Sequence, residues 1–127
     1  MNRASSSTVP DIQLNLERFD MSRINSSQTI AFVAQRRSGK SVSIKDIMCH
    51  MRDIPIGTVV CPTECVNKFY SEFVPPVLIH DDYTPQIIDN VVKRQLKANR
   101  ENVKRKKRGL PPIDARAFLI LDDCMYD

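Results

Sequence analysis

Apolar residues along the chain fall first into short runs that predict strands. Four runs of four or five residues consist mainly of apolar or β-branched residues, which is typical of strands buried in a parallel sheet. They occupy residues 29–33, 57–61, 77–80 and 117–121. Pro62 ends the second run, and Pro75 and Pro76 precede the third, so each segment is clearly delimited.

Between these runs, apolar positions repeat at the spacing of one helix face. Three such stripes, at i, i+3, i+4 and i+7 or i+8, predict three helices. Thr84 followed by Pro85 is typical of a helix start. The alternation of strands and helices predicts an α/β fold with a mainly parallel sheet flanked by helices. The stripes comprise Ile44, Ile47, Met48 and Met51, then Val66, Phe69, Tyr70 and Phe73, then Ile88, Val91, Val92 and Leu96.

The chain length of 127 residues fits a single domain. Residues 1–10 are Ser-rich and carry no apolar signal segment, so we expect a disordered lead-in there. Residues 11–127 then form the domain. Charge and the breakers Gly109, Pro111 and Pro112 predict an exposed loop over residues 105–112.

The loop between the first strand and the first helix carries candidate chemistry. It matches the phosphate-binding pattern G-x-x-x-x-G-K-[ST] except at its first position. Its backbone N–H groups can cradle phosphates, Lys40 supplies charge for the β- and γ-phosphates, and Ser41 is placed to ligate Mg²⁺. We therefore expect binding of ATP with Mg²⁺, against the alternative of a chance turn before a helix. The loop residues are Ala34, Gln35, Arg36, Arg37, Ser38, Gly39, Lys40 and Ser41.

Carboxylates at the ends of two strands form a second set of candidates. Asp122 and Asp123 follow the apolar run 117–121, where a Walker-B pair would hold Mg²⁺ and activate water respectively. The alternative for this pair is a solvated turn. Glu64, after the second strand, is a weaker catalytic candidate, because an acid in the first turn of a helix is already favoured by the helix dipole.

Charge is distributed unevenly although the net charge is only +4. Nine basic residues and one acid, Glu101, lie between residues 93 and 108, so that segment carries +8 and the rest 4 − 8 = −4. A local basic patch suggests a polyanionic partner, with a solvated surface loop as the alternative. The basic residues are Lys93, Arg94, Lys97, Arg100, Lys104, Arg105, Lys106, Lys107 and Arg108.

Composition narrows the class of protein further. The chain is 42% hydrophobic and has no apolar run near the roughly 20 residues of a membrane helix, so we expect no membrane span. Its four cysteines lack the spacing of a zinc site, and we expect reduced thiols rather than a disulfide framework.

Together these residues resemble the DNA-packaging ATPases of the nucleocytoplasmic large DNA viruses, a poxvirus-, iridovirus-, phycodnavirus- and mimivirus-like group in the FtsK–HerA superfamily of P-loop NTPases. The resemblance covers most of the chain. It rests on A-Q-R-R-S-G-K-S, on P-T-E-C-V-N-K-F-Y followed by V-P-P-V-L-I-H, on the pair R-Q at Arg94 and Gln95, and on F-L-I-L-D-D-C-M-Y-D.

The resemblance implies an ATP-driven motor, working as a homo-oligomeric ring, that moves viral double-stranded DNA into capsids. It implies portal or vertex components of the capsid as partners, and a location in viral factories of the host cytoplasm and in the virion. Lys40 and Ser41 would bind nucleotide and Mg²⁺, with Asp122 and Asp123 as the Walker-B pair.

Family members continue past the position of Asp127, so residues 11–127 resemble the N-terminal part of the ATPase domain, truncated after the Walker-B strand. The family topology implies that run 29–33 is not paired directly with run 117–121 and that this chain alone is inactive. Two rival functions stay open. A small P-loop kinase or GTPase would need an acceptor-site or base-recognition motif, and a nucleotide-dependent DNA-binding module would bind without turnover.

Overall fold

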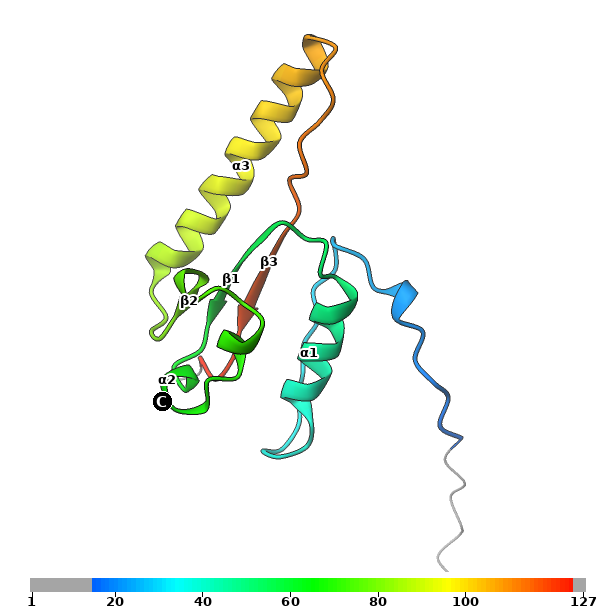
Figure 1. Cartoon of the computed structure of the whole chain (residues 1–127), viewed down its shortest axis with the longest axis vertical. Helices are drawn as coiled ribbons and strands as arrows, with labels where there is room; N and C mark the ends of the chain where they lie inside the picture. Colours follow the sequence, from blue (N-terminus) through cyan, green and yellow to red (C-terminus); the bar gives the residue numbers. More distant parts are fainter. Residues whose placement is uncertain (1–14, 125–127) are drawn as a thin grey trace, which may run out of the picture.

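The computed structural model describes residues 15–124. The expected disorder of residues 1–10 and the residues 125–127 of the D-D-C-M-Y-D motif lie outside this range. Within residues 15–124 the chain forms three short 3₁₀ turns, at Met21–Arg23, Tyr70–Glu72 and Pro76–Leu78. The main elements, in order, are α1 (Lys40–His50), β1 (Ile56–Val60), α2 (Glu64–Asn67), β2 (Ile79–His80), α3 (Pro85–Lys107) and β3 (Ala117–Leu121) (Figure 1).

The three strands form one parallel sheet in the order β2-β1-β3. Val59 of the central strand is the register partner of both Ile79 and Ile120. Parallel strands need long crossovers, and here α2 with its following turns and then α3 supply them. The predicted α/β class with a parallel sheet and flanking helices is therefore confirmed.

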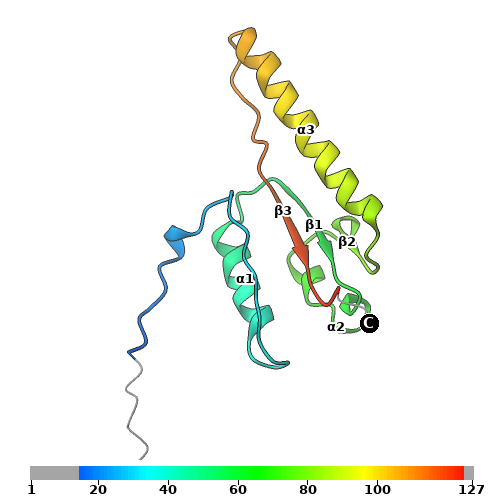
Figure 2. The same ribbon diagram turned by 180° about the vertical axis from the view of Figure 1, so that it is seen from behind.

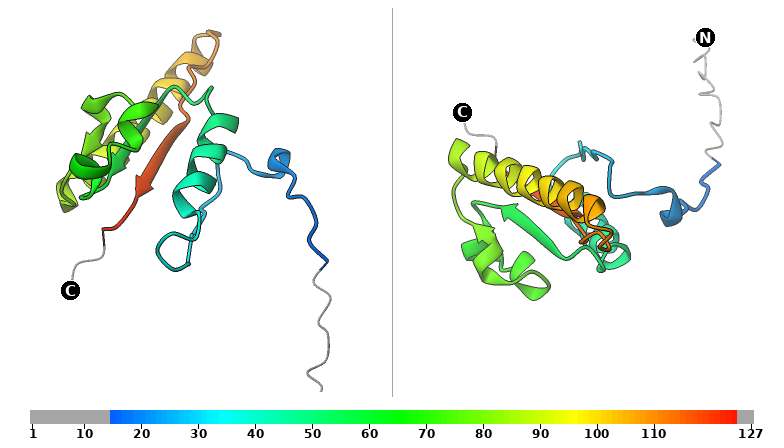
Figure 3. Two further views of the ribbon diagram at one scale, coloured as in Figure 1. Left: turned by 60° about the horizontal axis from the view of Figure 1, so that its bottom comes forward. Right: turned by 90° about the horizontal axis from the view of Figure 1, so that it is seen from above.

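The two faces of the sheet are covered differently. Figure 3 shows α3 over one face, while α1 and the segment between β1 and β2 lie on the other; Figure 2 shows the same arrangement from behind. Side chains alternate along a strand. Thr58 accordingly meets Arg94 of α3, whereas Val59 belongs to the core formed with Tyr70 and Val74 on the opposite face.

The core is small and lies on the α1 side of the sheet. Its buried members are Val59, Cys61, Tyr70 and Val74. Phe69 and Phe73 pack around the Tyr70 ring, with centroid distances of 5.1 Å and 5.8 Å to it. Aromatic side chains bury large apolar areas, so this cluster anchors the β1–β2 connection against the sheet.

The strand predicted over residues 29–33 is wrong. In the structure this segment is irregular and exposed, and it runs along α1, where Ile30 and Phe32 line an open groove with Ile47. A strand needs a hydrogen-bonded neighbour, and within residues 15–124 the segment has none. The family topology implies that residues 29–33 do not pair directly with residues 117–121, and in the structure they do not.

Two other predicted elements are shorter than expected. The helix predicted across residues 66–73 breaks after Asn67, because Lys68 adopts a left-handed conformation with φ of 48°. The chain then forms the turn at Tyr70–Glu72. The third strand is reduced to Ile79–His80, since the preceding Pro76–Leu78 forms a 3₁₀ turn.

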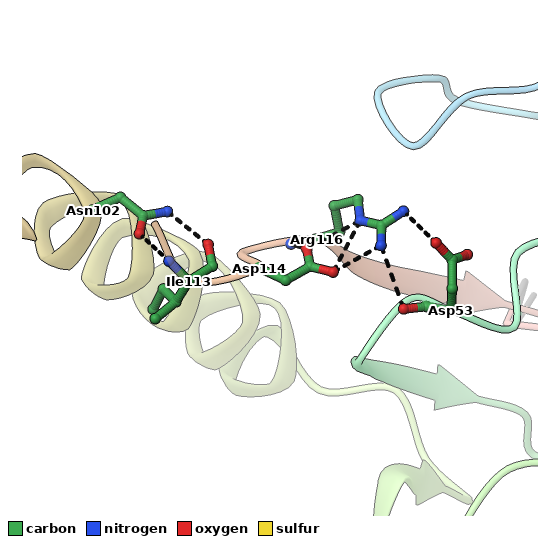
Figure 4. Close-up of polar contacts among 5 residues, drawn as sticks. All are labelled: Asp53, Asn102, Ile113, Asp114 and Arg116. Carbon is green, nitrogen blue, oxygen red and sulfur yellow. Dashed lines mark hydrogen bonds and ion pairs between the residues drawn. The ribbon is translucent and has the colours of Figure 1, made fainter. Parts of the chain in front are cut away.

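Helix α3 is longer than predicted, because residues 105–107 are helical rather than part of a loop. Basic residues suit the last turn of a helix, where they complement the dipole. The returning segment also stabilises this end: the side-chain amide of Asn102 donates to Ile113 O at 3.0 Å and accepts from Ile113 N at 2.8 Å (Figure 4). Together α3 and this segment form an arm, residues 85–116, that projects beyond the sheet (Figure 1).

Arg116 fixes the base of the arm where β3 begins. Its guanidinium lies 2.7 Å from Asp114 Oδ2 and 2.8 Å from Asp53 Oδ2, in the loop between α1 and β1 (Figure 4). The hydrogen bonds from Arg116 lower the pKa of Asp114 to about 2. Within residues 15–124, no helix has the length and apolar character needed to cross a membrane.

Candidate functional site

The loop 34–39 and the carboxyl ends of β1 and β3 lie at the same end of the molecule (Figures 1 and 2). Helix α1 runs antiparallel to the strands, so its N-terminus and the strand ends face the same way. Ligands of α/β proteins bind outside the carboxyl ends of parallel strands. The fold thus brings both predicted sets of site residues to the edge where such sites occur.

The loop itself is an open turn with two left-handed residues. Arg37 has a φ of 62° and Gly39 a φ of 89°, and a Cβ atom built on Gly39 would meet no atom within 4 Å. The hydroxyl of Ser38 closes the turn by donating to Gln35 O at 2.7 Å. Ala34, where the phosphate-binding pattern has glycine, does not have a positive φ, so alanine causes no backbone strain there.

Helix α1 begins at Lys40 with its polar end free. Gly39 is its N-cap and offers no capping side chain, and its first turn contains no acidic residue. The first N–H groups of a helix have no partner within the helix and carry partial positive charge. Lys40 forms no salt bridge within the described residues, and Ser41 is exposed. This end of α1 is therefore available to an anion.

Asp122 continues the ladder beyond the end of β3. Its backbone N–H donates to Val60 O at 3.0 Å, which keeps it in line with the central strand. The hydroxyl of Tyr70 donates to Asp122 Oδ2 at 2.8 Å. Burial is the larger cause and this hydrogen bond to a carboxylate the smaller one, and together they raise the pKa of Tyr70 far above its ordinary value. The Tyr70 hydroxyl therefore keeps its proton and is the donor.

Asp123 turns away from the ladder with a left-handed φ of 52°. Its carboxylate is exposed and accepts a hydrogen bond from the Thr63 hydroxyl at 3.3 Å. Cys124 then donates through Sγ to Val60 O at 3.3 Å. The two acids are therefore directed differently: Asp122 toward the buried Tyr70 and Asp123 toward the rim, where water has access.

Glu64 lies beside these acids but has a different environment. It is buried, and its two carboxylate oxygens accept the backbone N–H groups of Tyr70 at 3.0 Å and Ser71 at 2.7 Å. Burial alone would raise the pKa of Glu64, but these backbone hydrogen bonds outweigh it and the pKa is lowered. The geometry favours an anchoring role for Glu64 over the catalytic role considered for it.

The arm carries the basic residues on more than one face. The Arg94 guanidinium turns inward and donates to Thr58 Oγ1 at 3.3 Å, and Arg105 donates to Pro111 O at 3.0 Å. Five exposed cations follow each other at spacings of four and three residues, which places them on one face of α3. This basic stripe consists of Lys93, Lys97, Arg100, Lys104 and Lys107.

Two polar side chains at the site were not identified from the sequence. Thr63 enters the sequence analysis only as part of the motif P-T-E-C-V-N-K-F-Y, and Tyr70 only as a member of an apolar stripe. A signal for Tyr70 existed, because a tyrosine buried in a helix-like stripe usually needs a hydrogen-bond partner for its hydroxyl. No comparable signal distinguishes Thr63.

Comparison with known proteins finds relatives in large DNA viruses. Over 113 residues the chain is 37% identical to an uncharacterized protein of Acanthamoeba polyphaga mimivirus, covering 89% of this chain and 39% of that protein. It is 38% identical over 99 residues to an uncharacterized protein of Invertebrate iridescent virus 6, covering 77% and 35%, and 33% identical over 97 residues to one of Frog virus 3, covering 76% and 28%.

The chain spans less than two fifths of the length of each of these three relatives. No protein-family model matches it, and no solved structure does. The matches establish relatedness to proteins of large DNA viruses. The packaging ATPase implied by the sequence motifs stays a prediction.

Proposed function

We propose that this chain is part of an ATP-hydrolysing motor subunit that packages viral double-stranded DNA into capsids. The observation that carries the proposal is that an open loop with a free helix N-terminus and two carboxylates lie at the same end of the molecule, where the parallel strands end. Relatives in mimivirus and iridoviruses agree with a viral role. A homo-oligomeric ring and capsid portal or vertex components as partners belong to the same proposal.

The loop and α1 fit the triphosphate of ATP. Phosphate needs N–H donors and positive charge, and the first turn of α1 offers unpaired N–H groups beside Lys40. Open space around Gly39 lets a phosphate approach the backbone closely. The exposed Ser41 hydroxyl is one position further along α1, where this class of loop ligates Mg²⁺.

The carboxylates fit the metal and the attacking water. Within the described residues no hydrogen bond engages Asp122 Oδ1, so this atom is free to hold Mg²⁺ directly or through water. The exposed Asp123 is placed to accept a proton from water. When bound, Mg²⁺ would neutralise charge that develops on the phosphates, while residues of the chain position the ATP and the attacking water.

The basic stripe supports DNA as the second partner. Phosphate contacts supply most of the sequence-independent affinity for DNA, and a row of cations on one helix face suits a phosphate backbone. The stripe lies on an arm whose own return segment is fixed by Asn102 and Arg116. The arm therefore presents its charges with little loss of conformational freedom. Because viral DNA is the proposed partner, we also propose that the protein acts in viral factories of the host cytoplasm and in the virion.

The nucleotide part of the proposal is tested by Lys40→Ala in the intact protein, with binding followed by a fluorescent ATP analogue. Loss of a charge that contacts phosphate should weaken binding at least about tenfold, since charged hydrogen bonds contribute roughly 1.5–3 kcal/mol. Lys45→Ala is the matched control. Lys45 is on the same helix but pairs with Glu72 at 2.8 Å, so ATP affinity should hardly change.

Equal affinities for the wild-type protein and Lys40→Ala would reject the nucleotide site. Two further assays separate the rival functions. Preference for GTP, or transfer of labelled phosphate to an acceptor, would favour a GTPase or kinase. Binding of ATP and DNA without turnover in the intact protein would favour a nucleotide-dependent DNA-binding module.

A further inference from the structure

Tyr70 combines almost complete burial with a polar contact to the candidate metal ligand. Its side chain is 1% exposed, and its hydroxyl lies 2.8 Å from Asp122 Oδ2. A phenylalanine would fill the same apolar space, so packing alone does not call for the hydroxyl. Among residues 15–124 the hydroxyl makes one hydrogen bond, and that bond reaches across 52 residues of sequence to the end of β3.

The Tyr70 ring is held from several sides. Glu64 binds the backbone N–H groups of Tyr70 and Ser71, which fixes the turn that carries the ring. Phe69 and Phe73 pack against the ring at 5.1 Å and 5.8 Å between centroids. A donor anchored in this way has little freedom to follow a moving partner, so the partner carboxylate must adapt to it.

We propose that Tyr70 is a positioning residue that orients Asp122 for metal binding. The inference rests on the proposed function. Its hydrogen bond occupies Oδ2 and leaves Oδ1 as the ligand atom, so the carboxylate does not rotate freely at the end of β3. Hydrogen bonds from hydroxyls to carboxylates are short and strong, and partners of metal ligands commonly change metal affinity by about 10–100-fold.

The alternative is a purely structural role for the hydrogen bond between Tyr70 and Asp122. In that case Asp122 only satisfies a buried hydroxyl, and losing the hydrogen bond affects folding but not the metal. The two explanations differ in how Tyr70→Phe behaves when Asp122 is also changed. A positioning role acts through Asp122, whereas a folding effect does not depend on which residue binds the metal.

The test measures Mn²⁺ affinity by electron paramagnetic resonance, with saturating ADP, in the intact protein and in Tyr70→Phe, Asp122→Asn and the double variant. Tyr70→Phe should weaken Mn²⁺ binding about 10-fold or more and leave ADP affinity measured without metal unchanged. In the Asp122→Asn background the same change should have no further effect. Tyr83→Phe, which removes an exposed hydroxyl, is the matched control and should bind Mn²⁺ normally.

Thermal unfolding of each variant identifies any that fails to fold. If Tyr70→Phe does not fold, Asp122→Ala and Asp122→Glu replace it. Asp122→Glu keeps a carboxylate for the metal but moves it away from the Tyr70 hydroxyl. Asp122→Glu should then bind Mn²⁺ no better than Asp122→Ala. Unchanged affinity in Tyr70→Phe, or equal losses in both backgrounds, would overturn the positioning role. If the wild-type protein binds neither ADP nor Mn²⁺, the proposed function fails instead.

Discussion

Gly57 of β1 and Phe118 of β3 are register partners, and the Phe118 ring occupies the space that a side chain at Gly57 would need. The ring lies on the core face, beside Val59 and Ile120. Glycine is unfavourable within strands unless another group uses the space it leaves. The same parallel register continues to Val60 and Leu121, where both strands end at the candidate site.

This contact predicts that Gly57→Ala destabilises the fold. The added methyl group overlaps the Phe118 ring, and overpacking of this kind usually costs about 1–3 kcal/mol. Urea unfolding of the intact protein measures the change in the free energy of unfolding. In a Phe118→Leu background the same substitution should cost clearly less, because the ring is gone; equal costs in both backgrounds would show that the ring does not exclude the methyl group.

A second prediction separates the two acids after β3. If the proposed function holds, Asp123→Asn should retain ATP binding, because the loop 34–39 is untouched, but slow hydrolysis by about 100-fold or more through loss of the proposed general base. Steady-state ATPase assays and nucleotide titrations measure the two effects. Asp81→Asn, an exposed acid in the turn after β2, should be near normal in both. Near-normal turnover in Asp123→Asn would assign the base to another residue.

Glu64 yields a prediction about pH. Its lowered pKa means that the folded state holds the carboxylate more strongly than the unfolded chain does. The resulting stabilisation is fully present above the unfolded pKa of about 4.3 and is lost as the pH falls through the lower pKa of the folded state. Glu64→Gln replaces an acceptor oxygen with an N–H₂ group that faces a backbone donor, which should cost about 1–3 kcal/mol at neutral pH.

Urea unfolding at several pH values checks this sign. The difference in stability between wild type and Glu64→Gln should be largest at neutral pH and shrink below about pH 4. Glu72→Gln provides the comparison, since it removes only an exposed ion pair with Lys45 and should change stability little. A gap that widened in acid would contradict the anchoring role of Glu64.

The sequence predicted those features that depend on local pattern. The strand around Val59, the last strand before Asp122 and the start of α3 at Pro85 all agree with their apolar runs and caps. Residues 29–33 have an equally strong strand pattern but form no strand, because β structure depends on a neighbour that a pattern does not reveal. The parallel sheet places Glu64 and the two acids after β3 at one end, whereas the loop lies at that end because α1 runs antiparallel to the strands.

Contacts between residues far apart in the chain are harder to predict from the sequence. The apolar stripe through Tyr70 is the same for a continuous helix and for the observed break at Lys68, which depends on a left-handed residue and on the Glu64 carboxylate. The basic residues of α3 could be counted, but their directions could not be known. The inward turn of Arg94 toward Thr58 depends on where β1 lies, and this is a property of the folded sheet.

The last prediction concerns the outward direction of the basic stripe, in contrast to the inward direction of Arg94. If the basic stripe contacts DNA, replacing Lys97, Arg100 and Lys104 with Gln should weaken binding to all DNA sequences alike and preserve the helix, since Gln is a good helix former. Each phosphate contact contributes about 0.9 to the slope of log K against log salt concentration, so the slope should flatten by up to about 2.7. Fluorescence anisotropy with a labelled duplex at several salt concentrations measures it.

The matched control changes the net charge by the same amount elsewhere. Arg18, Arg23 and Arg52 are exposed and lie outside the arm, so replacing them with Gln should lower DNA affinity only slightly and leave the slope nearly unchanged. Arg94→Gln should also leave the slope unchanged, because its guanidinium contacts Thr58. Equal flattening in the stripe and control variants would mean that DNA responds to overall charge, and the stripe would then be a solvated helix face.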